Sequence, residues 1–511
     1  MLSKLNTLCL KGIDGREVSA EVYIASGLPA YSVVGLPDAA VKEAKDRVVA
    51  AVRNSGFEFP SKRITVNLAP AEIKKAGTHF DLPIALGVIA ASGRLGKKPP
   101  DRFEDTFFIG ELALDGALRP VAGVLPMLLA LKGKGRTAVV PAGNSAEAAI
   151  SGVNCLSATS LKEVTAWLSG EAELRSCSLP ESPQAPAAAY NDFSEVKGQP
   201  FAKRALEIAA AGFHNAILVG PPGSGKSMLA RRFGALLPPM TFDESLETTK
   251  LYSVSGLCAA GRLIRERPFR EPHHTISDAA LIGGGSSPRP GEVSLAHNGV
   301  LFLDEFPEFS RPAIEALREP LEAWKVTVSR VKESVAYPAR FLLVAAMNPC
   351  PCGYLGHPTR ECACTPLQVH KYRAKISGPI LDRIDLQVQL SAVRYADWEA
   401  LPRGESSAVI AGRVLKAIEI QRARFKGGAK ANAFMSGAEL HRHCALPEGA
   451  SAVLEIAMNK LGFSARSLDK ILKISRTIAD LEGAAGIKRE HIIEAVQYRM
   501  LDKSAAVAAG F

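Results

Sequence analysis

The feature that most constrains the fold of this 511-residue chain is a glycine-rich octapeptide. It reads Gly220-Pro221-Pro222-Gly223-Ser224-Gly225-Lys226-Ser227 and fits the pattern G-x-x-x-x-G-K-[ST]. The apolar run Ala216–Val219 precedes it and a helical stretch follows it. In a strand–loop–helix of this kind, backbone N–H groups surround phosphates, Lys226 reaches the β- and γ-phosphates, and the Ser227 hydroxyl ligates Mg²⁺. The segment therefore predicts an α/β unit that binds ATP, although a glycine-rich turn can match the pattern by chance.

Two later apolar runs end in polar side chains that suit the same chemistry. Val300–Leu303 is followed by Asp304 and Glu305, and the run that begins at Phe341 ends at Asn348. Two acids at the end of a strand can deliver Asp304 to Mg²⁺ and Glu305 to the attacking water, and the Asn348 amide can orient that water. Taken alone, a solvated acidic pair and an Asn-Pro turn are the simpler explanations. Their position after the P-loop favours a nucleotide site.

The order of these motifs resembles that of an AAA+ ATPase. Gly291–Phe306, Ile380–Leu386 and Phe463–Arg466 are similar to segments of the magnesium-chelatase and MCM-helicase branch. Arg270–Gly285 resembles the ComM (YifB-like, Mg chelatase-like) proteins more specifically. The resemblance covers nearly the whole chain. It implies an α/β protein that hydrolyses ATP with Mg²⁺.

The resemblance also implies three domains. Residues 1–170 are similar to a Lon-protease/S5-like domain, residues 191–403 form the AAA+ P-loop core, and residues 404–511 form a helical C-terminal lid. A segment rich in Pro, Ser and Ala, at 171–190, is typical of a linker. Short β-rich runs at Val18–Ile24, Arg63–Leu68 and Thr137–Val140, with helical runs at Asp38–Asn54 and Asp81–Ser92, predict a mixed α/β front domain.

We expect no peptidase activity from the front domain. A Lon-type protease needs a Ser nucleophile and a Lys base within hydrogen-bond reach of each other. Aligned on Ala76-Gly77, the nucleophile position holds Lys75 and the base position falls at about Leu125. We expect the Lys74-Lys75 pair to lie in a solvated loop, with contact to DNA or a partner as the alternative.

By resemblance, Arg383 is an arginine finger inserted into the site of a neighbouring subunit, and Arg466 is a sensor arginine of the lid. A guanidinium complements the negative charge of a phosphoryl-transfer transition state. A finger that acts in trans requires a homo-oligomer, by resemblance a hexamer. An ion pair of Arg383 within its own chain, with the flanking Asp382 or Asp385, is the competing explanation.

Two segments are candidates for contact with DNA. Trp324–Ala339 alternates Val326 and Val328 with polar residues and then turns basic, which predicts a β-hairpin with Arg330 and Lys332 at its tip. The segment Ile282–Asn298, which contains Arg289, resembles the helix-2 insertion of the same branch. Such loops would contact phosphates without reading sequence. A solvated hairpin is the simpler alternative.

Four of the nine cysteines lie within fifteen residues, in a C-x-C-x9-C-x-C pattern. They are Cys350, Cys352, Cys362 and Cys364. Four thiolates suit tetrahedral Zn²⁺, and His357 is a further candidate ligand. Free thiols or reducible disulfides are the alternatives, and the scarcity of cysteine elsewhere favours a reducing, cytoplasmic location.

Composition excludes several other classes of protein. The longest apolar stretch, Leu82–Gly93, is too short to span a bilayer, and the first residues carry no secretion signal. The net charge is +10, from 62 Lys+Arg and 52 Asp+Glu, which favours a polyanionic partner.

The resemblance implies a function on DNA. It is that of an ATP-dependent helicase that branch-migrates recombination intermediates, as in natural transformation. Its partners would be single-stranded, forked or branched DNA and recombination proteins. Two alternatives stay open: a chelatase-like subunit that remodels a partner protein, and a regulatory ATPase of transcription. The second is weaker because neither end of the chain shows a helix-turn-helix pattern.

Overall fold

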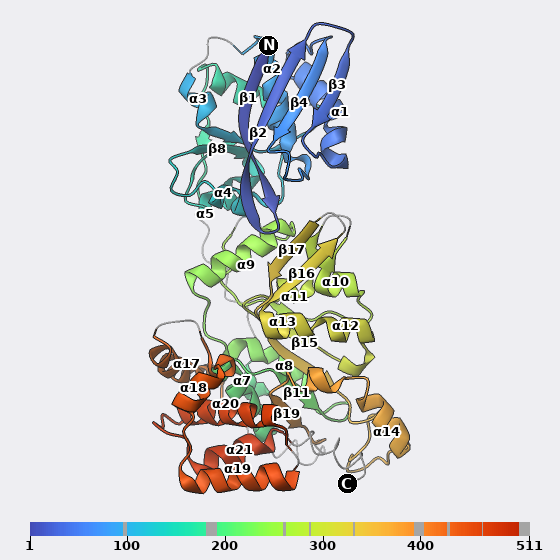
Figure 1. Ribbon diagram of the computed structural model, residues 1–511, viewed down its shortest axis with the longest axis vertical. Coiled ribbons are helices and arrows are strands. Elements are labelled where there is room, and N and C mark those ends of the chain that lie inside the picture. The colour runs from blue at the N-terminus through green and yellow to red at the C-terminus, as the bar shows by residue number, and fades with distance from the viewer. Residues whose placement is uncertain are drawn as a thin grey trace. The chain divides into compact units, whose positions relative to one another are not determined.

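The computed structural model describes residues 1–95, 100–179, 192–258, 262–285, 288–330, 333–392, 403–426, 430–461 and 463–499 (Figure 1). The chain divides into two compact units. Unit 1 comprises Met1–Ala185 and Phe242–Ile264, and unit 2 comprises Pro186–Thr241 and Arg265–Phe511. Each unit has a sheet and a hydrophobic core of its own.

Unit 1 is built on an eight-stranded mixed sheet in the order β10-β9-β8-β5-β1-β2-β4-β3. The strands are β1 (Leu2–Lys11), β2 (Asp14–Ala25), β3 (Ala30–Val34), β4 (Arg63–Ala69), β5 (Thr106–Phe108), β8 (Thr137–Pro141), β9 (Asn154–Ala158) and β10 (Arg175–Ser176). Buried and exposed residues alternate along β4, as expected for a strand with one face on the core. The strands predicted at Val18–Ile24, Arg63–Leu68 and Thr137–Val140 are confirmed as β2, β4 and β8.

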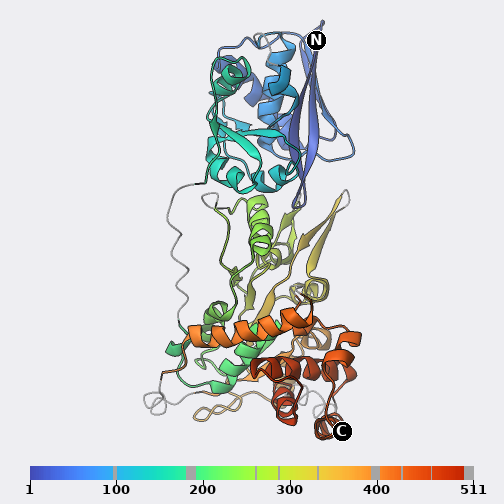
Figure 2. The same ribbon diagram turned by 90° about the vertical axis from the view of Figure 1, so that its left-hand side faces the viewer.

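The two predicted helices of unit 1 are also confirmed, as α1 (Ala39–Asn54) and α2 (Asp81–Ala91). Asp38 caps α1, since its carboxylate accepts a hydrogen bond from the Val41 N–H at 2.9 Å. Ten of the eleven residues of α2 are buried, because the helix packs against α1 and against strands β1 and β2. In Figure 2 the helices of this unit lie beside its strands. The short elements of this unit are α3 (Pro100–Glu104), β6 (Glu111–Leu112), β7 (Leu118–Arg119), α4 (Val124–Leu129), α5 (Ser145–Ile150) and α6 (Leu161–Leu168).

The expectation of a solvated Lys74-Lys75 loop is wrong for Lys75. Its side chain is fully buried, and its Nζ donates a hydrogen bond to the Pro70 carbonyl. Burial lowers the pKa of Lys75, since a charged ammonium is poorly solvated there. Lys75 is therefore part of the interior of unit 1 and presents no charge to a partner.

Helix α9 (Phe242–Val254) belongs to unit 1, although it comes after the P-loop in the chain. It packs against α4 with Leu251 fully buried. Its C-terminal end is bonded to the unit twice, because the Ser253 carbonyl accepts from the Gly123 N–H at 3.0 Å and the Ser253 hydroxyl donates to the buried Glu147 carboxylate. Both bonds lie in the interior, which fixes the helix to residues far away in sequence.

Unit 2 contains a five-stranded, wholly parallel sheet in the order β12-β15-β18-β11-β19. The strands are β12 (Phe269–Arg270), β15 (Val300–Leu303), β18 (Leu342–Met347), β11 (Ala216–Val219) and β19 (Leu386–Gln389). Every residue of β11, β15 and β18 is buried, as expected for parallel strands covered on both faces. The three apolar runs that the sequence predicts as buried strands are these three strands.

Helices and a hairpin surround this sheet. The helices of the core are α7 (Pro200–Gly212), α8 (Lys226–Phe233), α10 (Asp278–Ile282), α11 (Glu292–Leu295), α12 (Arg311–Ala316), α13 (Arg318–Ala323), α14 (Pro366–Arg373) and α15 (Gly378–Leu381). The two small ribbons pair β13 (Gly283–Gly284) with β14 (Arg289–Pro290) and β16 (Lys325–Arg330) with β17 (Glu333–Pro338). The latter confirms the predicted hairpin.

The C-terminal part of unit 2 is helical, as predicted. It consists of α17 (Ser407–Arg424), α18 (Gly437–His443), α19 (Glu448–Leu461), α20 (Ala465–Leu481) and α21 (Arg489–Gln497), which form one group in Figure 1. Helices α17 and α20 both pack on α7, so the apolar core of the sheet layer continues into this group.

Candidate nucleotide-binding site

Within the octapeptide, residues 220–225 form the loop between β11 and α8, and Lys226 and Ser227 begin the helix. Gly223 and Gly225 have φ values of +76° and +90°, in a region that residues with a Cβ rarely adopt. The loop is supported from outside by Gln199, whose side-chain amide donates to the Ser224 carbonyl at 3.2 Å and to the Ser391 carbonyl at 2.8 Å. The sequence analysis did not identify Gln199.

Lys226 is nearly buried at the start of α8. Its Nζ donates to the carbonyls of Gly220 at 2.6 Å and Pro221 at 3.0 Å, and to Asn348 Oδ1 at 3.1 Å. Burial lowers the pKa of Lys226, while the nearby charges of Asp304 and Glu305 oppose that shift. The P-loop lysine and the predicted strand-terminal amide are therefore in direct contact.

Asp304 lies against the other side of the loop. Its Oδ2 accepts from the Ser227 hydroxyl at 2.6 Å, and its Oδ1 accepts from the Glu305 N–H at 2.8 Å. The site assembles because the carboxyl ends of β11, β15 and β18 meet at one edge of a parallel sheet, where ligands of open α/β folds bind. The structure thus brings together Lys226, Ser227, Asp304, Glu305 and Asn348 as the motifs predict.

Glu305 has a partner that the sequence analysis missed. His274 Nδ1 lies 3.0 Å from Glu305 Oε2, and the Glu305 side chain is about half exposed. The backbone of Glu305 has φ +51°, so the carboxylate is presented from a turn directly after β15. His274 follows β12, the strand that pairs with β15. The His-His pair in Arg270–Gly285 was visible in the sequence, but nothing local connected it to Glu305.

The structure does not place Arg383 and Arg466 at the P-loop of their own chain. Arg383 donates to the Glu322 carboxylate and to the Pro379 carbonyl. The expected competing partners Asp382 and Asp385 are engaged elsewhere: Asp382 with the exposed Arg466 at 3.7 Å, and Asp385 with Lys470 at 2.7 Å. An intrachain ion pair of Arg383 does exist, but its partner, Glu322, is a residue that the sequence did not suggest.

The two candidate DNA loops lie beside each other. The Tyr337 hydroxyl of β17 donates to the Pro288 carbonyl at 2.8 Å, and a Cβ at Gly283 would lie 3.3 Å from Val328 of β16. Arg289 is exposed in β14, and Arg330 ends β16 opposite Glu333. Lys332 lies outside the described residues. The hairpin and the 283–290 ribbon are thus in direct contact.

An aromatic cluster connects the root of the hairpin to the C-terminal helices. The Arg340 guanidinium lies 5.3 Å from the Phe213 ring, 5.8 Å from Trp324 and 5.6 Å from Phe434. Trp324 precedes β16, Arg340 follows β17, and Phe434 precedes α18. Cation–π contacts of this kind contribute about 0.5–2 kcal/mol each.

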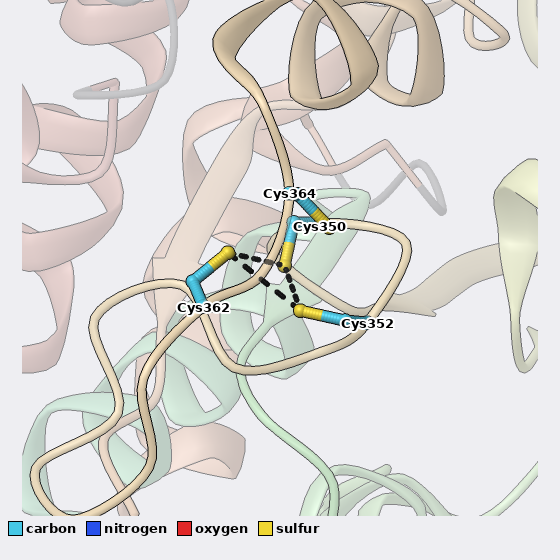
Figure 3. A group of neighbouring side chains, drawn as sticks. All are labelled: Cys350, Cys352, Cys362 and Cys364. Carbon is cyan, nitrogen blue, oxygen red and sulfur yellow. Dashed lines mark hydrogen bonds between the residues drawn. The ribbon is translucent and has the colours of Figure 1, made fainter.

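The four clustered cysteines converge immediately after Asn348 (Figure 3). Their sulfur atoms all lie within 4.8 Å of one another, with Cys350 buried and the other three partly exposed. Among the described residues, His357 is not in this group. Its Nδ1 accepts hydrogen bonds from the backbone N–H groups of Thr359 at 3.2 Å and Arg360 at 3.1 Å, which turns the ring into its own loop.

Comparison with known proteins gives family matches to most of the chain. The family "Magnesium chelatase, subunit ChlI" matches residues 192–398, its C-terminal domain family matches 404–499, and "Subunit ChlI of Mg-chelatase" matches 20–144. The chain is 44% identical to YifB of Escherichia coli over 98% of both chains, and 44% identical to competence protein ComM of Haemophilus influenzae over 96% of both. The chain belongs to the ComM/YifB family of magnesium-chelatase-like AAA+ proteins.

A more distant relative is the magnesium-chelatase 38 kDa subunit of Rhodobacter capsulatus. It is 24% identical over 59% of this chain and 84% of its own length. Membership of this AAA+ family implies ATPase activity with ATP and Mg²⁺. In the part of the ComM/YifB-family chain that the structure describes, no helix has both the length and the apolar character needed to cross a membrane.

Proposed function

We propose that the protein is an ATP-driven motor that assembles into a ring, moves along DNA and promotes branch migration of recombination intermediates, as in natural transformation. The relative named competence protein ComM, 44% identical over nearly the full length, supports a role in DNA uptake or recombination. The observation that carries the proposal is that a single strand of unit 2, β18, follows the basic hairpin in the chain and ends at the nucleotide site.

The nucleotide chemistry would follow from the geometry at the sheet edge. Lys226 exchanges its carbonyl partners for the β- and γ-phosphates of ATP, and the backbone N–H groups of the loop from Gly220 to Gly225 surround them. Ser227 and Asp304 fit a Mg²⁺ ion, because both offer hard oxygen atoms 2.6 Å apart. Bound Mg²⁺ neutralises phosphate charge. Glu305 accepts a proton from the attacking water, and Asn348 orients that water.

Hydrolysis would be transmitted through strand β18. The hairpin strand β17 ends at Pro338, and β18 begins soon after it, at Leu342. Strand β18 ends directly before Asn348, whose side chain accepts a hydrogen bond from Lys226. A shift of Asn348 on loss of the γ-phosphate therefore acts on the strand that carries the hairpin. The Arg340 cluster couples the hairpin root to the C-terminal lid in the same way. Arg330, Lys332 and Arg289 would contact the phosphate backbone of single-stranded, forked or branched DNA.

A complete site would need a second copy of the chain. Arg383 supplies the finger in trans after leaving Glu322, and Arg466 approaches the phosphates from the lid, which makes a homo-oligomer, by family resemblance a hexamer, part of the proposal. We propose the domain boundaries 1–170, 171–190, 191–403 and 404–511, with Phe242–Ile264 of the third segment packed into unit 1. Residues 180–190 of the linker lie outside the described residues.

The front domain would be a non-catalytic docking domain for recombination proteins. Lys75 occupies the position of a Lon-type nucleophile, and its Nζ is bound to the Pro70 carbonyl in the interior. Leu125, near the position of the base, is a buried aliphatic side chain. Neither can take part in nucleophilic attack on a peptide. ATP-dependent cleavage of casein that Lys75→Ala abolishes would contradict this part of the proposal.

The test is a three-strand or Holliday-junction migration assay with the purified chain. We expect ATP-dependent migration, weakening steeply with salt because the contacts are to phosphates. Arg330→Ala with Lys332→Ala should keep the basal ATPase rate but lose stimulation by DNA. The matched control is Arg311→Ala with Arg318→Ala, which removes two charges from α12 and α13. Normal migration by the hairpin variant would show that the hairpin does not move DNA.

A second candidate is a chelatase-like subunit that remodels a partner enzyme. The family matches and the Rhodobacter capsulatus relative favour it, and the match to residues 20–144 removes the front domain as an argument against it. The two candidates differ in what stimulates ATP hydrolysis. If forked or four-way-junction DNA leaves the rate unchanged at low salt, the protein-remodelling role is favoured.

A further inference from the structure

The cysteine group has the dimensions of a metal site. Cys350 Sγ lies 3.4 Å from Cys352 Sγ and 3.6 Å from Cys362 Sγ, and the last two are 3.6 Å apart (Figure 3). Four thiolates at about 2.3 Å from a tetrahedral Zn²⁺ are about 3.8 Å from one another. A disulfide brings two sulfurs to about 2.05 Å and leaves the others apart. Three sulfurs at nearly equal separations, with Cys364 beside them, match the metal site and not a disulfide pair.

The loop that carries the cysteines closes on itself between β18 and α14. The Gly353 N–H donates to the Cys350 carbonyl at 3.0 Å. This bond closes a tight turn over Cys350–Gly353 that contains the first two cysteines. Tyr354 binds Arg360 through its hydroxyl at 2.7 Å and its ring at 5.1 Å. Helix α14 begins two residues after Cys364, with a capping box at Thr365.

This turn packs on the P-loop. A Cβ built at Gly353 would lie 2.8 Å from Pro222 Cδ, 2.9 Å from Pro222 Cγ and 3.9 Å from Asn348 Cγ. Gly353 is buried and has φ +84°, so the close approach and the backbone both require glycine. The cysteine turn thus contacts both the phosphate-binding loop and the residue that holds Lys226.

We propose that Cys350, Cys352, Cys362 and Cys364 bind one Zn²⁺, and that this ion holds the Cys350–Gly353 turn against Pro222 and so sets the affinity of the P-loop for ATP. This inference rests on the proposed nucleotide site. The zinc is structural, because four protein thiolates complete its tetrahedral coordination and leave no position for water or substrate. Its contribution is rigidity, because it joins the Cys350–Gly353 turn to Cys362 and Cys364 near the start of α14.

The first measurement is the metal content of the purified full-length chain. We expect about one zinc per chain, its loss in Cys362→Ser with Cys364→Ser, and its retention in the matched double variant Cys177→Ser with Cys258→Ser. Chains loaded with Co²⁺ instead should show the intense thiolate-to-cobalt absorption of a tetrahedral sulfur site. A wild-type chain without zinc that also fails to bind Co²⁺ in this way would overturn the proposal.

The second measurement is the affinity for a fluorescent ATP analogue. Removal of zinc from the wild-type chain by a chelator should weaken binding about tenfold, corresponding to about 1.4 kcal/mol, and zinc should restore it. Because cysteine variants can fail to fold, a second pair of variants tests the contact itself. Gly353→Ala keeps the four ligands but pushes the turn off Pro222, so zinc should stay and affinity should fall.

Gly356→Ala is the control for Gly353→Ala. Gly356 has φ +77° and open space around it, so alanine there brings the same backbone strain without a clash. Equal effects of the two variants on affinity, or unchanged affinity after zinc removal, would overturn the coupling. Lys226→Ala should lose the analogue but keep zinc, so failure of the nucleotide site is distinguishable from failure of the metal site.

Discussion

At Lys226, one ammonium group is held by three oxygen atoms of the protein, two carbonyls of the loop and the Asn348 amide. These are acceptors that phosphate oxygens would replace. The protein therefore holds the lysine side chain in one place, and such preorganisation lowers the cost of ordering it on binding. The same argument applies to Ser227 and Asp304, whose oxygen atoms already face each other.

Two substitutions should separate binding from hydrolysis. Lys226→Ala removes the phosphate ligand and should abolish binding of ATP analogues. Glu305→Gln keeps the shape of the site but removes the proton acceptor, so we expect ATP binding to persist while the hydrolysis rate falls by about 10²–10⁴. Equilibrium binding and phosphate release measure the two properties. Loss of ATP binding in Glu305→Gln would show that the carboxylate has a role in binding.

We expect His274 to limit how readily the Glu305 carboxylate accepts a proton from water. Its imidazole lies 3.0 Å from the carboxylate that we propose as proton acceptor, and it competes with water for that oxygen. We expect His274→Ala to raise the ATPase rate without DNA by several-fold and to reduce the further stimulation by DNA. His273→Ala is the control, since His273 bonds to Thr275 instead. A fall in rate as large as that of Glu305→Gln would instead make His274 part of the catalytic machinery.

The residues of the nucleotide site were predictable because each lies in a local motif at the end of an apolar strand, and parallel strands bring such ends together. The partners of those residues were not. His274 and Glu305 are on neighbouring strands, Arg383 reaches Glu322 on α13, and Lys75 is buried by segments distant in the chain. These pairings depend on tertiary packing, which spacing along the sequence does not encode.

At the scale of elements, a buried polar network connects the sheet to the C-terminal helices. Asp385, just before β19, accepts from His214 at 3.2 Å and lies 2.7 Å from Lys470 of α20. His214 also bonds to Thr477 of α20 at 2.8 Å. Burial alone would raise the pKa of Asp385, but the adjacent Lys470 charge and the hydrogen bond with His214 hold it well below its usual range. Burial also lowers the pKa of Lys470.

We expect Asp385→Asn to destabilise unit 2 by about 3–5 kcal/mol at pH 7, because it leaves the Lys470 charge buried without its partner. A carboxyl group whose pKa is lowered by folding stabilises the protein above its unfolded pKa of about 3.9, and that stabilisation is lost as the pH falls through the folded pKa. The difference between wild type and variant in urea unfolding should therefore shrink below about pH 4.

Asp382→Asn is the control for this prediction. Asp382 pairs with Arg466, whose side chain is 76% exposed, at 3.7 Å, so its loss should cost less than about 1 kcal/mol. If the two variants unfold at the same urea concentration, the Asp385 network does not stabilise the contact between sheet and helices.

The strands and helices themselves were largely predictable. The apolar runs that became β11, β15 and β18 are bounded by glycine or by polar residues, and α1 begins where Asp38 offers its cap. The position of α9 was not predictable, because the helix packs on α4 and is bonded to Glu147, both more than ninety positions earlier in the chain. Four of its five buried residues, Ser245, Thr248, Thr249 and Ser253, are polar, so the sequence of the helix does not show which side packs.

At the scale of the whole assembly, the proposal requires that one active site draw on two chains. Arg383→Ala and Glu305→Gln should each inactivate the ATPase of a homogeneous ring, the first by about 10³–10⁵. In an equal mixture of the two variants, about a quarter of the interfaces combine an intact Glu305 with an intact Arg383. We therefore expect the mixture to regain measurable ATPase activity. A mixture as inactive as its components would place Arg383 in cis or remove it from catalysis.

The course of the polypeptide through the two units limits how the protein can be dissected. Because Phe242–Ile264 is integrated with residues 1–185, the peptide crosses from one unit to the other three times. A truncated chain that starts at the linker would retain α9 but lose α4 and Glu147. Leu251 would then be exposed to water on an apolar surface that favours aggregation. A clean excision of the front unit must also replace residues 242–264 with a short bridge. A protein that binds unit 1 is therefore connected to the proposed motor through three chain segments instead of a single linker.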